Sequence, residues 1–233
     1  MRKISKEIER LYSKITDRLF LTENFHKYQI KYSKIYSNNY KLEKNQYSFV
    51  HAPKTAGTSI STFLKKNDIF IFDSAHNLVS KNCDPKNYKY ITTIRNPIDR
   101  TKSFYEMQLN NKKLSFHHHS KKGLSIFLTK LKINQNCLCK FIIGDLNTDI
   151  DDKLYKKAEN NLRNFWYIID FENLDEDIKK LANKLDINSG LEHLGKKTKE
   201  NKLILSSEEL SLISKYNKFD LKLFEFFKNN LKN

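Results

Sequence analysis

Residues 47–66 read YSFVHAPKTAGTSISTFLKK, and this stretch decides the fold. Residues 47–51 alternate in side-chain polarity and are rich in β-forming residues, and this pattern predicts a strand. Residues 59–66 place apolar side chains on one face, which predicts a helix. The segment PKTAGTS at 53–59 joins the two as a glycine-containing turn. Such a turn directs several backbone N–H groups at one point, so it predicts a cradle for a phosphate-like anion.

The side chains of this turn favour the same interpretation. Lys54 adds a positive charge, and three hydroxyl donors are contributed by Thr55, Thr58 and Ser59. The order differs from that of a Walker A motif, in which glycine precedes lysine, because here Lys54 comes before Gly57. An ordinary turn capped by Thr58 or Ser59 is the alternative.

A second strand-to-helix turn is expected at residues 95–103, RNPIDRTKS. The preceding segment 88–94 (YKYITTI) predicts a strand. A helix is expected from Pro97 to about residue 109, because proline suits the first helical position. Both turns are therefore expected to join the end of a strand to the start of a helix.

Arg95 is the candidate anion ligand of the second turn. An arginine at a strand end can hold a phosphate in bidentate fashion, and the Ser103 hydroxyl follows in the next helix. Pro97, Arg100 and Ser103 are three residues apart, so they are expected to share a helix face. The alternative is a surface salt bridge from Arg95 to Asp99 or Glu106.

The rest of the chain continues the alternation of strands and helices. Further strands are predicted at 69–72 and 166–170, and further helices at 124–141 with an interruption near 134–136, at 175–185 and at 206–231. Residues 110–122 are expected to form a mobile basic loop. In the last helix the expected buried side chains are Leu210, Ile213, Tyr216, Leu221, Phe224 and Phe227. Strands separated by helices predict a parallel sheet covered on both faces.

Two regions are expected along the chain. Residues 1–46 predict an N-terminal amphipathic helix followed by a polar connector, and residues 47–233 predict one α/β domain. The 233 residues, 39% of them hydrophobic, exclude a wholly disordered chain. Gly 5 and Pro 3 exclude collagen-like and low-complexity classes.

Charge and cysteine content narrow the partners and the compartment. The net charge of +16 favours anionic partners, namely nucleic acid, phosphate or sulfate groups, or acidic lipid; solvated surface lysines are the alternative. Three cysteines imply no disulfide framework, and their spacing predicts no metal site. Without a long apolar run or an N-terminal apolar region, no membrane span and a cytoplasmic location are expected. A lumenal domain of an anchored protein is the alternative.

The two turns together resemble the sulfotransferases that use 3′-phosphoadenosine-5′-phosphosulfate (PAPS), in particular the glycan-type branch. The first motif of that family is a PKTGGTS-like turn for the 5′-phosphosulfate, and here Ala56 replaces one glycine. The second is R-[DN]-P-x-x-R-x-x-S for the 3′-phosphate, which 95–103 matches. Looser similarity covers NCLCKFIIG at 136–144, DFENL at 170–174 and LSSEEL at 205–210, so the resemblance spans roughly 47–228.

The resemblance implies a three-layer P-loop-like fold, PAPS as donor, 3′-phosphoadenosine-5′-phosphate (PAP) as product, and no metal. The implied donor-binding residues are Lys54, Thr55, Ala56, Gly57, Thr58, Ser59, Arg95, Ser103 and Lys197. Lys54 and His76 are the implied catalytic residues, with His76 as general base in the segment FDSAHN that follows the 69–72 strand. Asp73 is the substitute base, and a surface loop histidine is the alternative for His76.

The expected reaction is transfer of a sulfuryl group from PAPS to a hydroxyl or amine, on a glycan by family analogy, by in-line displacement. The basic segment around His117, His118 and His119 is expected to meet an acidic glycan rather than a metal, because adjacent residues point in different directions. A P-loop-like small-molecule kinase, a basic nucleic-acid-binding protein and a sulfotransferase-like fold used only for binding are the competing hypotheses. The acceptor and the oligomeric state stay open.

Overall fold

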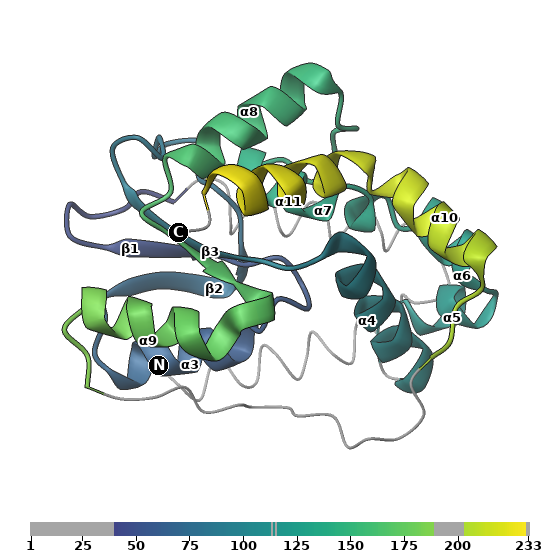
Figure 1. Ribbon diagram of the computed structural model, residues 1–233, viewed down its shortest axis with the longest axis horizontal. Helices are drawn as coiled ribbons and strands as arrows, with labels where there is room; N and C mark the ends of the chain where they lie inside the picture. The colour runs from purple at the N-terminus through teal and green to yellow at the C-terminus, as the bar shows by residue number, and fades with distance from the viewer. Residues whose placement is uncertain (1–39, 113, 115, 189–202, 232–233) are drawn as a thin grey trace.

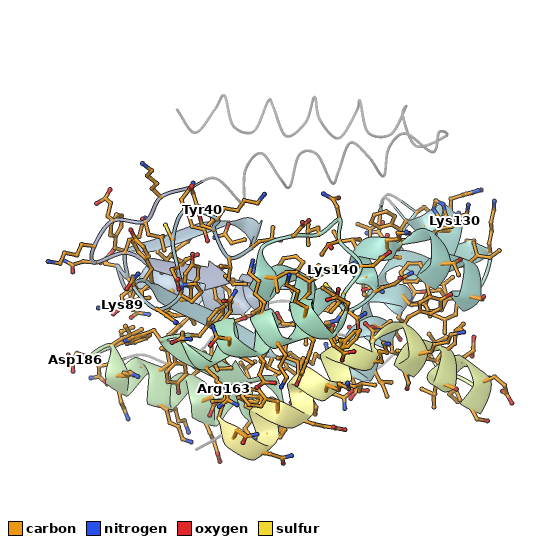
Figure 2. All side chains as sticks on the ribbon, turned by 90° about the horizontal axis from the view of Figure 1, so that it is seen from above. Tyr40, Lys89, Lys130, Lys140, Arg163 and Asp186 are labelled. Atoms are coloured by element: carbon orange, nitrogen blue, oxygen red, sulfur yellow. The ribbon has the colours of Figure 1, made fainter. Side chains whose placement is uncertain are left out.

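The computed structural model describes residues 40–231 except 113, 115 and 189–202, and the side chains of residues 72–76 lie outside that description. The predicted helix near the N-terminus therefore falls outside the described residues. The end of the predicted connector falls inside them, and Tyr40 and Leu42 are buried there. The Tyr40 hydroxyl (Figure 2) lies 2.8 Å from the Ser48 hydroxyl and donates to the Leu78 carbonyl at 2.7 Å.

One parallel sheet lies at the centre of the described structure (Figure 1). Its strand order is β2-β1-β3-β4, and every neighbouring pair is parallel. The strands are β1 (Tyr47–Val50), β2 (Ile71–Asn77), β3 (Lys89–Ile94) and β4 (Tyr167–Asp170). The predicted α/β class with a parallel sheet is confirmed.

Helices cover both faces of this sheet (Figure 1). One face packs against α7 (Cys137–Ile143), α8 (Asp152–Arg163) and α11 (Lys218–Asn230). The other packs against α3 (Gly57–Lys66) and α9 (Leu174–Lys184). The predicted two-sided cover is confirmed.

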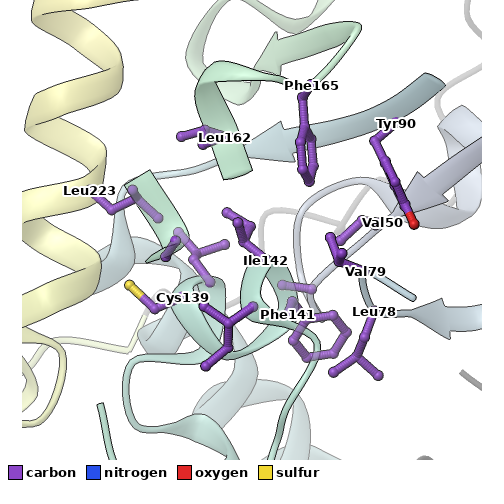
Figure 3. Close-up of a cluster of buried hydrophobic side chains, with 14 of the residues drawn as sticks. Val50, Leu78, Val79, Tyr90, Cys139, Phe141, Ile142, Leu162, Phe165 and Leu223 are labelled. Carbon is purple, nitrogen blue, oxygen red and sulfur yellow. The ribbon is translucent and has the colours of Figure 1, made fainter. Parts of the chain in front are cut away.

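The larger core lies between the sheet and the α7, α8 and α11 layer (Figure 3). Val50 and Tyr90 enter it from the strands, and Ile142, Leu162 and Leu223 enter it from the three helices. Each fully buried aliphatic side chain of this kind contributes about 1.5–3 kcal/mol. This core fixes β1 and β3 side by side, and with them the turns at their carboxyl ends.

A helical group extends beyond the carboxyl ends of the strands (Figure 1). It contains α4 (Pro97–Asn110), α5 (His117–Lys121), α6 (Leu124–Lys130) and α10 (Ser207–Tyr216), with the 3-10 turn η1 (Lys132–Asn134) after α6. A separate apolar cluster holds these helices together. The predicted interruption near 134–136 is confirmed by the break between α6 and α7. None of the described helices is long and apolar enough to cross a bilayer.

Two local predictions, one of a strand and one of a loop, are wrong for physical reasons. The second strand is β2 (Ile71–Asn77) rather than 69–72, because β2 is an edge strand that pairs on one side only and tolerates the polar sequence FDSAHN. Phe70, predicted inside the strand, is 50% exposed. The mobile loop predicted at 110–122 contains α5, because Phe116 and Leu124 are buried and anchor its two ends.

The predicted single helix 206–231 is two helices that meet at the buried Asn217. The break changes the helical phase after Asn217, so Leu221 and Phe224 are only partly buried. Before the break, Leu210 is 38% exposed and Tyr216 is partly buried. Ile213 and Phe227 are buried as expected, and Phe219, Leu223 and Phe226 fill the rest of the core.

Candidate functional site

The two candidate turns lie side by side at the carboxyl edge of the sheet. β1 and β3 are hydrogen-bonded neighbours in register from Tyr47 opposite Lys89 to Val50 opposite Thr92, so the chain leaves both strands at the same edge. The Arg95 guanidinium then donates through Nη1 to the Lys54 carbonyl at 2.9 Å. The turn after β3 therefore contacts the turn after β1 directly.

The first turn leads into a helix whose N-cap residue makes no side-chain cap. Lys54 and Ala56 both adopt left-handed conformations, with φ of 71° and 59°. Ala56 is the N-cap residue of α3, so its side chain cannot accept a hydrogen bond from the helix, and the first turn of α3 carries no acidic residue. An uncapped helix start of this kind presents N–H groups and the positive end of the helix dipole to an anion.

The side chains of the first turn divide into structural and outward-facing groups. The Thr55 hydroxyl is buried and donates to the Ala52 carbonyl at 2.8 Å, so it fixes the turn. Ser59 is buried on α3, whereas Thr58 is exposed. The Lys54 ammonium lies 3.7 Å from the Met107 sulfur on α4, which places this cation beside the helix that follows the second turn.

Gly57 is required by a close approach. A Cβ at this position would overlap the ring of His51, which is buried and stacks on Phe49 with 5.3 Å between ring centroids. The His51 ring therefore packs against the turn at Gly57 and leaves room there for glycine alone. Sequence reasoning missed this role, and the signal was the position of His51 as the last residue of the alternating stretch.

The second turn works differently, because its helix is already capped. The Asn96 Oδ1 accepts from the Ile98 N–H at 2.9 Å and from the Asp99 N–H at 3.4 Å, and Pro97 occupies the first turn. With Asp99 also in that turn, the backbone offers little to an anion. The Arg95 side chain is the group that can attract one.

Arg95 lies in a partly buried, aromatic-lined position. The guanidinium carbon lies 4.2 Å from the centroid of the Phe171 ring. Burial lowers the pKa of Arg95, while the carboxylates of Asp99 and Glu172 raise it again. Its Nε is buried and has no hydrogen-bond partner among the described residues. Ser103 is half-buried two turns into α4.

Arg100, expected on one helix face with Ser103, has a different environment. It is fully buried and donates through Nη2 to the Thr101 hydroxyl at 3.0 Å and to Asn134 Oδ1 at 2.9 Å. A guanidinium held in this way joins α4 to η1. Of the two arginines of the motif, Arg95 is the one at the turn.

The predicted base and the last predicted donor residue lie at the limits of the described structure. His76 lies within β2, one residue before Asn77, which is in register with Val50. Its expected position in a loop after the strand is therefore wrong, but its backbone lies at the same sheet edge as the first turn. The side chains of His76 and Asp73, and all of Lys197, lie outside the described residues.

The three consecutive histidines belong to α5, beyond the far end of α4. His117 Nδ1 lies 2.8 Å from the Gln108 carbonyl oxygen. Burial lowers the pKa of His119, and the cations of His118, Lys122 and Lys130 lower it further. In the described part of the chain, no group of three or more His, Cys, Asp or Glu residues is placed to hold a metal ion.

The fold and the two turns define an α/β protein with a parallel sheet and adjoining strand-to-helix turns at one edge. No protein-family model matches the chain, and no curated protein matches it significantly.

Proposed function

We propose that this chain is a PAPS-dependent sulfotransferase with a three-layer P-loop-like fold, acting in the cytoplasm on a hydroxyl or amine of a glycan. The observation that carries the proposal is the 2.9 Å hydrogen bond from Arg95 Nη1 to the Lys54 carbonyl. It joins two turns of different chemistry at one sheet edge, where α/β proteins bind nucleotides. A donor with separate 5′ and 3′ phosphate groups suits such a pair of turns.

Each turn has a distinct task in this proposal. The N–H groups at the start of α3, with Lys54, bind the 5′-phosphosulfate and stabilise the charge that develops on the leaving 5′-phosphate. Arg95 and Ser103 bind the 3′-phosphate and so orient the donor.

Sulfuryl transfer then balances as a single displacement. The acceptor oxygen forms a bond to sulfur while the bond between sulfur and the bridging oxygen of the 5′-phosphate breaks. The hydroxyl proton passes to the base, for which His76 is the candidate, and PAP leaves.

The positive charge of the helical group beyond the sheet favours a negatively charged acceptor. Residues 107–144 contain no Asp or Glu. Among the described residues of this segment, the exposed basic side chains are those of Lys112, His118, Lys121, Lys122, Lys130 and Lys132. The 14 residues of α4 separate this basic surface from the second turn by about 21 Å, at 1.5 Å of rise per residue. An extended anionic glycan could span that distance.

The test is thermal stabilisation by PAP, beside 5′-AMP and beside ATP with Mg²⁺. A ligand at about 100 times its Kd adds about 2.7 kcal/mol, which corresponds to a Tm increase of about 5–11 °C for a domain of this size. We expect a PAP-selective increase that Arg95→Ala abolishes. Arg163→Ala is the matched control, because Arg163 (Figure 2) also lies 4.2 Å above an aromatic ring, that of Phe226, but belongs to α8.

Two results would contradict the proposal. One is the absence of any increase with PAP, and the other is an equal increase with ATP that requires Mg²⁺. The second result would favour the kinase hypothesis, since Mg²⁺-bound ATP is the kinase donor.

A further inference from the structure

The short turn that follows β4 lies against the second anion turn. This 3-10 turn, η2 (Phe171–Asn173), contributes two side chains to the contact. The Phe171 ring lies under the Arg95 guanidinium at 4.2 Å, and Glu172 Oε1 accepts from the Asn96 N–H at 3.0 Å. Residues 76 positions apart in the sequence thus fix two consecutive residues of the second turn.

The turn η2 is itself held by a buried network. Asp170 is fully buried and accepts from the Glu172 N–H at 3.1 Å and from Asn173 Nδ2 at 2.8 Å. Lys228 reaches it from α11, with Nζ at 3.1 Å and 2.9 Å from the two carboxylate oxygens, and lies 3.6 Å from Glu172 Oε2. The platform under Arg95 is therefore tied to the C-terminal helix.

These contacts determine how Arg95 presents its charge. An arginine side chain is long and rotatable, and ordering it on ligand binding costs affinity. Stacking on Phe171 and the bond to the Lys54 carbonyl restrict that freedom beforehand. Glu172 accepts from the Asn96 backbone N–H and lies 3.6 Å from Lys228, so it holds the residue that follows Arg95 in place.

We propose that Phe171 and Glu172 are positioning residues, which hold Arg95 and Asn96 in the arrangement that recognises the 3′-phosphate of a 3′,5′-bisphosphorylated nucleotide. This inference rests on the proposed function and deepens it. Because both residues act through the second turn, their removal weakens recognition of the 3′-phosphate and leaves recognition of the 5′-phosphate unchanged.

The experiment compares Kd values for PAP and for 5′-AMP, which lacks the 3′-phosphate, by titration calorimetry. We expect Phe171→Leu to weaken PAP binding about fivefold to tenfold, the range of a partly buried cation–π contact. We expect Phe171→Leu to leave the affinity for 5′-AMP unchanged. Phe171→Trp, which keeps an aromatic ring under Arg95, is expected to bind PAP as wild type does. Phe70→Leu is the control, because Phe70 is half exposed and precedes the amino end of β2.

Glu172 offers a second, isosteric test. Glu172→Gln retains an oxygen that accepts from the Asn96 backbone N–H, so PAP affinity stays within about twofold of wild type. Glu172→Met removes the acceptor and is expected to weaken PAP binding about fivefold. The Tm of each variant without ligand is measured alongside, so a variant that unfolds is recognised.

The outcomes separate the two proposals. If the wild-type chain does not bind PAP, the proposed function is overturned. If wild type binds PAP and Arg95→Ala loses it, while folded Phe171→Leu and Glu172→Met bind PAP normally, only the positioning inference is overturned. Equal weakening of PAP and 5′-AMP would also overturn it, since that result is expected of a purely structural role.

Discussion

Replacing Gly57 with alanine tests whether the approach of His51 shapes the first turn. The added Cβ would overlap the buried His51 ring, which cannot move freely because it stacks on Phe49. Overpacking of this kind costs about 1–3 kcal/mol, and the preference of a helix for alanine returns up to about 1 kcal/mol. We expect a net loss of about 1–2 kcal/mol in the free energy of unfolding, or a fall of about 2–8 °C in Tm.

A double-mutant cycle with His51→Ala isolates the cause. If the overlap is responsible, Gly57→Ala costs little in the His51→Ala background, and the coupling free energy is about 1 kcal/mol or more. Gly123→Ala serves as control, because a Cβ at Gly123 meets nothing within 4 Å, although its φ of 99° still strains an alanine. Its cost should add to that of His51→Ala. A Gly57→Ala variant as stable as wild type, or additive with His51→Ala, would refute the reasoning.

Three further changes have expected outcomes. Ala56→Gly should raise the free energy of unfolding by about 0.5–1 kcal/mol in urea denaturation, because φ of 59° strains an alanine more than the flexibility of glycine costs. Asp220→Asn should lower it by about 3 kcal/mol, because the buried carboxylate near Arg100 accepts the backbone N–H groups of Leu138 and Cys139. Acidification should lower Tm partly through His119: burial lowers its pKa, so the unfolded chain gains the proton first below about pH 6.5. His119→Asn should flatten that dependence in a Tm series from about pH 5 to 8.

The sequence predicted the strands and helices correctly where several strong local signals coincide. At 47–66 and 88–109, an alternating strand, a punctuating Gly or Pro and a periodic helix follow one another, and the structure has β1, α3, β3 and α4 there. The cap of α4 by the Asn96 side chain was not predicted, although asparagine is a favoured residue at this position. Local patterns of this kind depend on neighbouring residues, so they can be read from one chain.

Contacts between distant segments could not be read in this way. The stacking of Arg95 on Phe171 depends on the pairing of β4 with β3. No local sequence pattern predicts that pairing. The break at Asn217 interrupts an apolar pattern that continues on both sides, because Asn136 Oδ1 accepts from the Phe219 N–H and starts a new helix. In both cases a partner far along the chain decides the local structure.

The two turns would bind anions by different physics, and they differ in how much sequence change they tolerate. The first would act through backbone N–H groups and the Lys54 ammonium, so the side chain at position 56 matters mainly through the φ it allows. Ala56 can therefore stand where the sulfotransferase-like pattern has glycine, as long as it keeps its φ of 59°. The second would act through one guanidinium, because the Asn96 side chain already accepts from the first N–H groups of its helix. Arg95 consequently has no substitute in that turn, and its orientation depends on Phe171, which sequence motifs of the turn alone would not include.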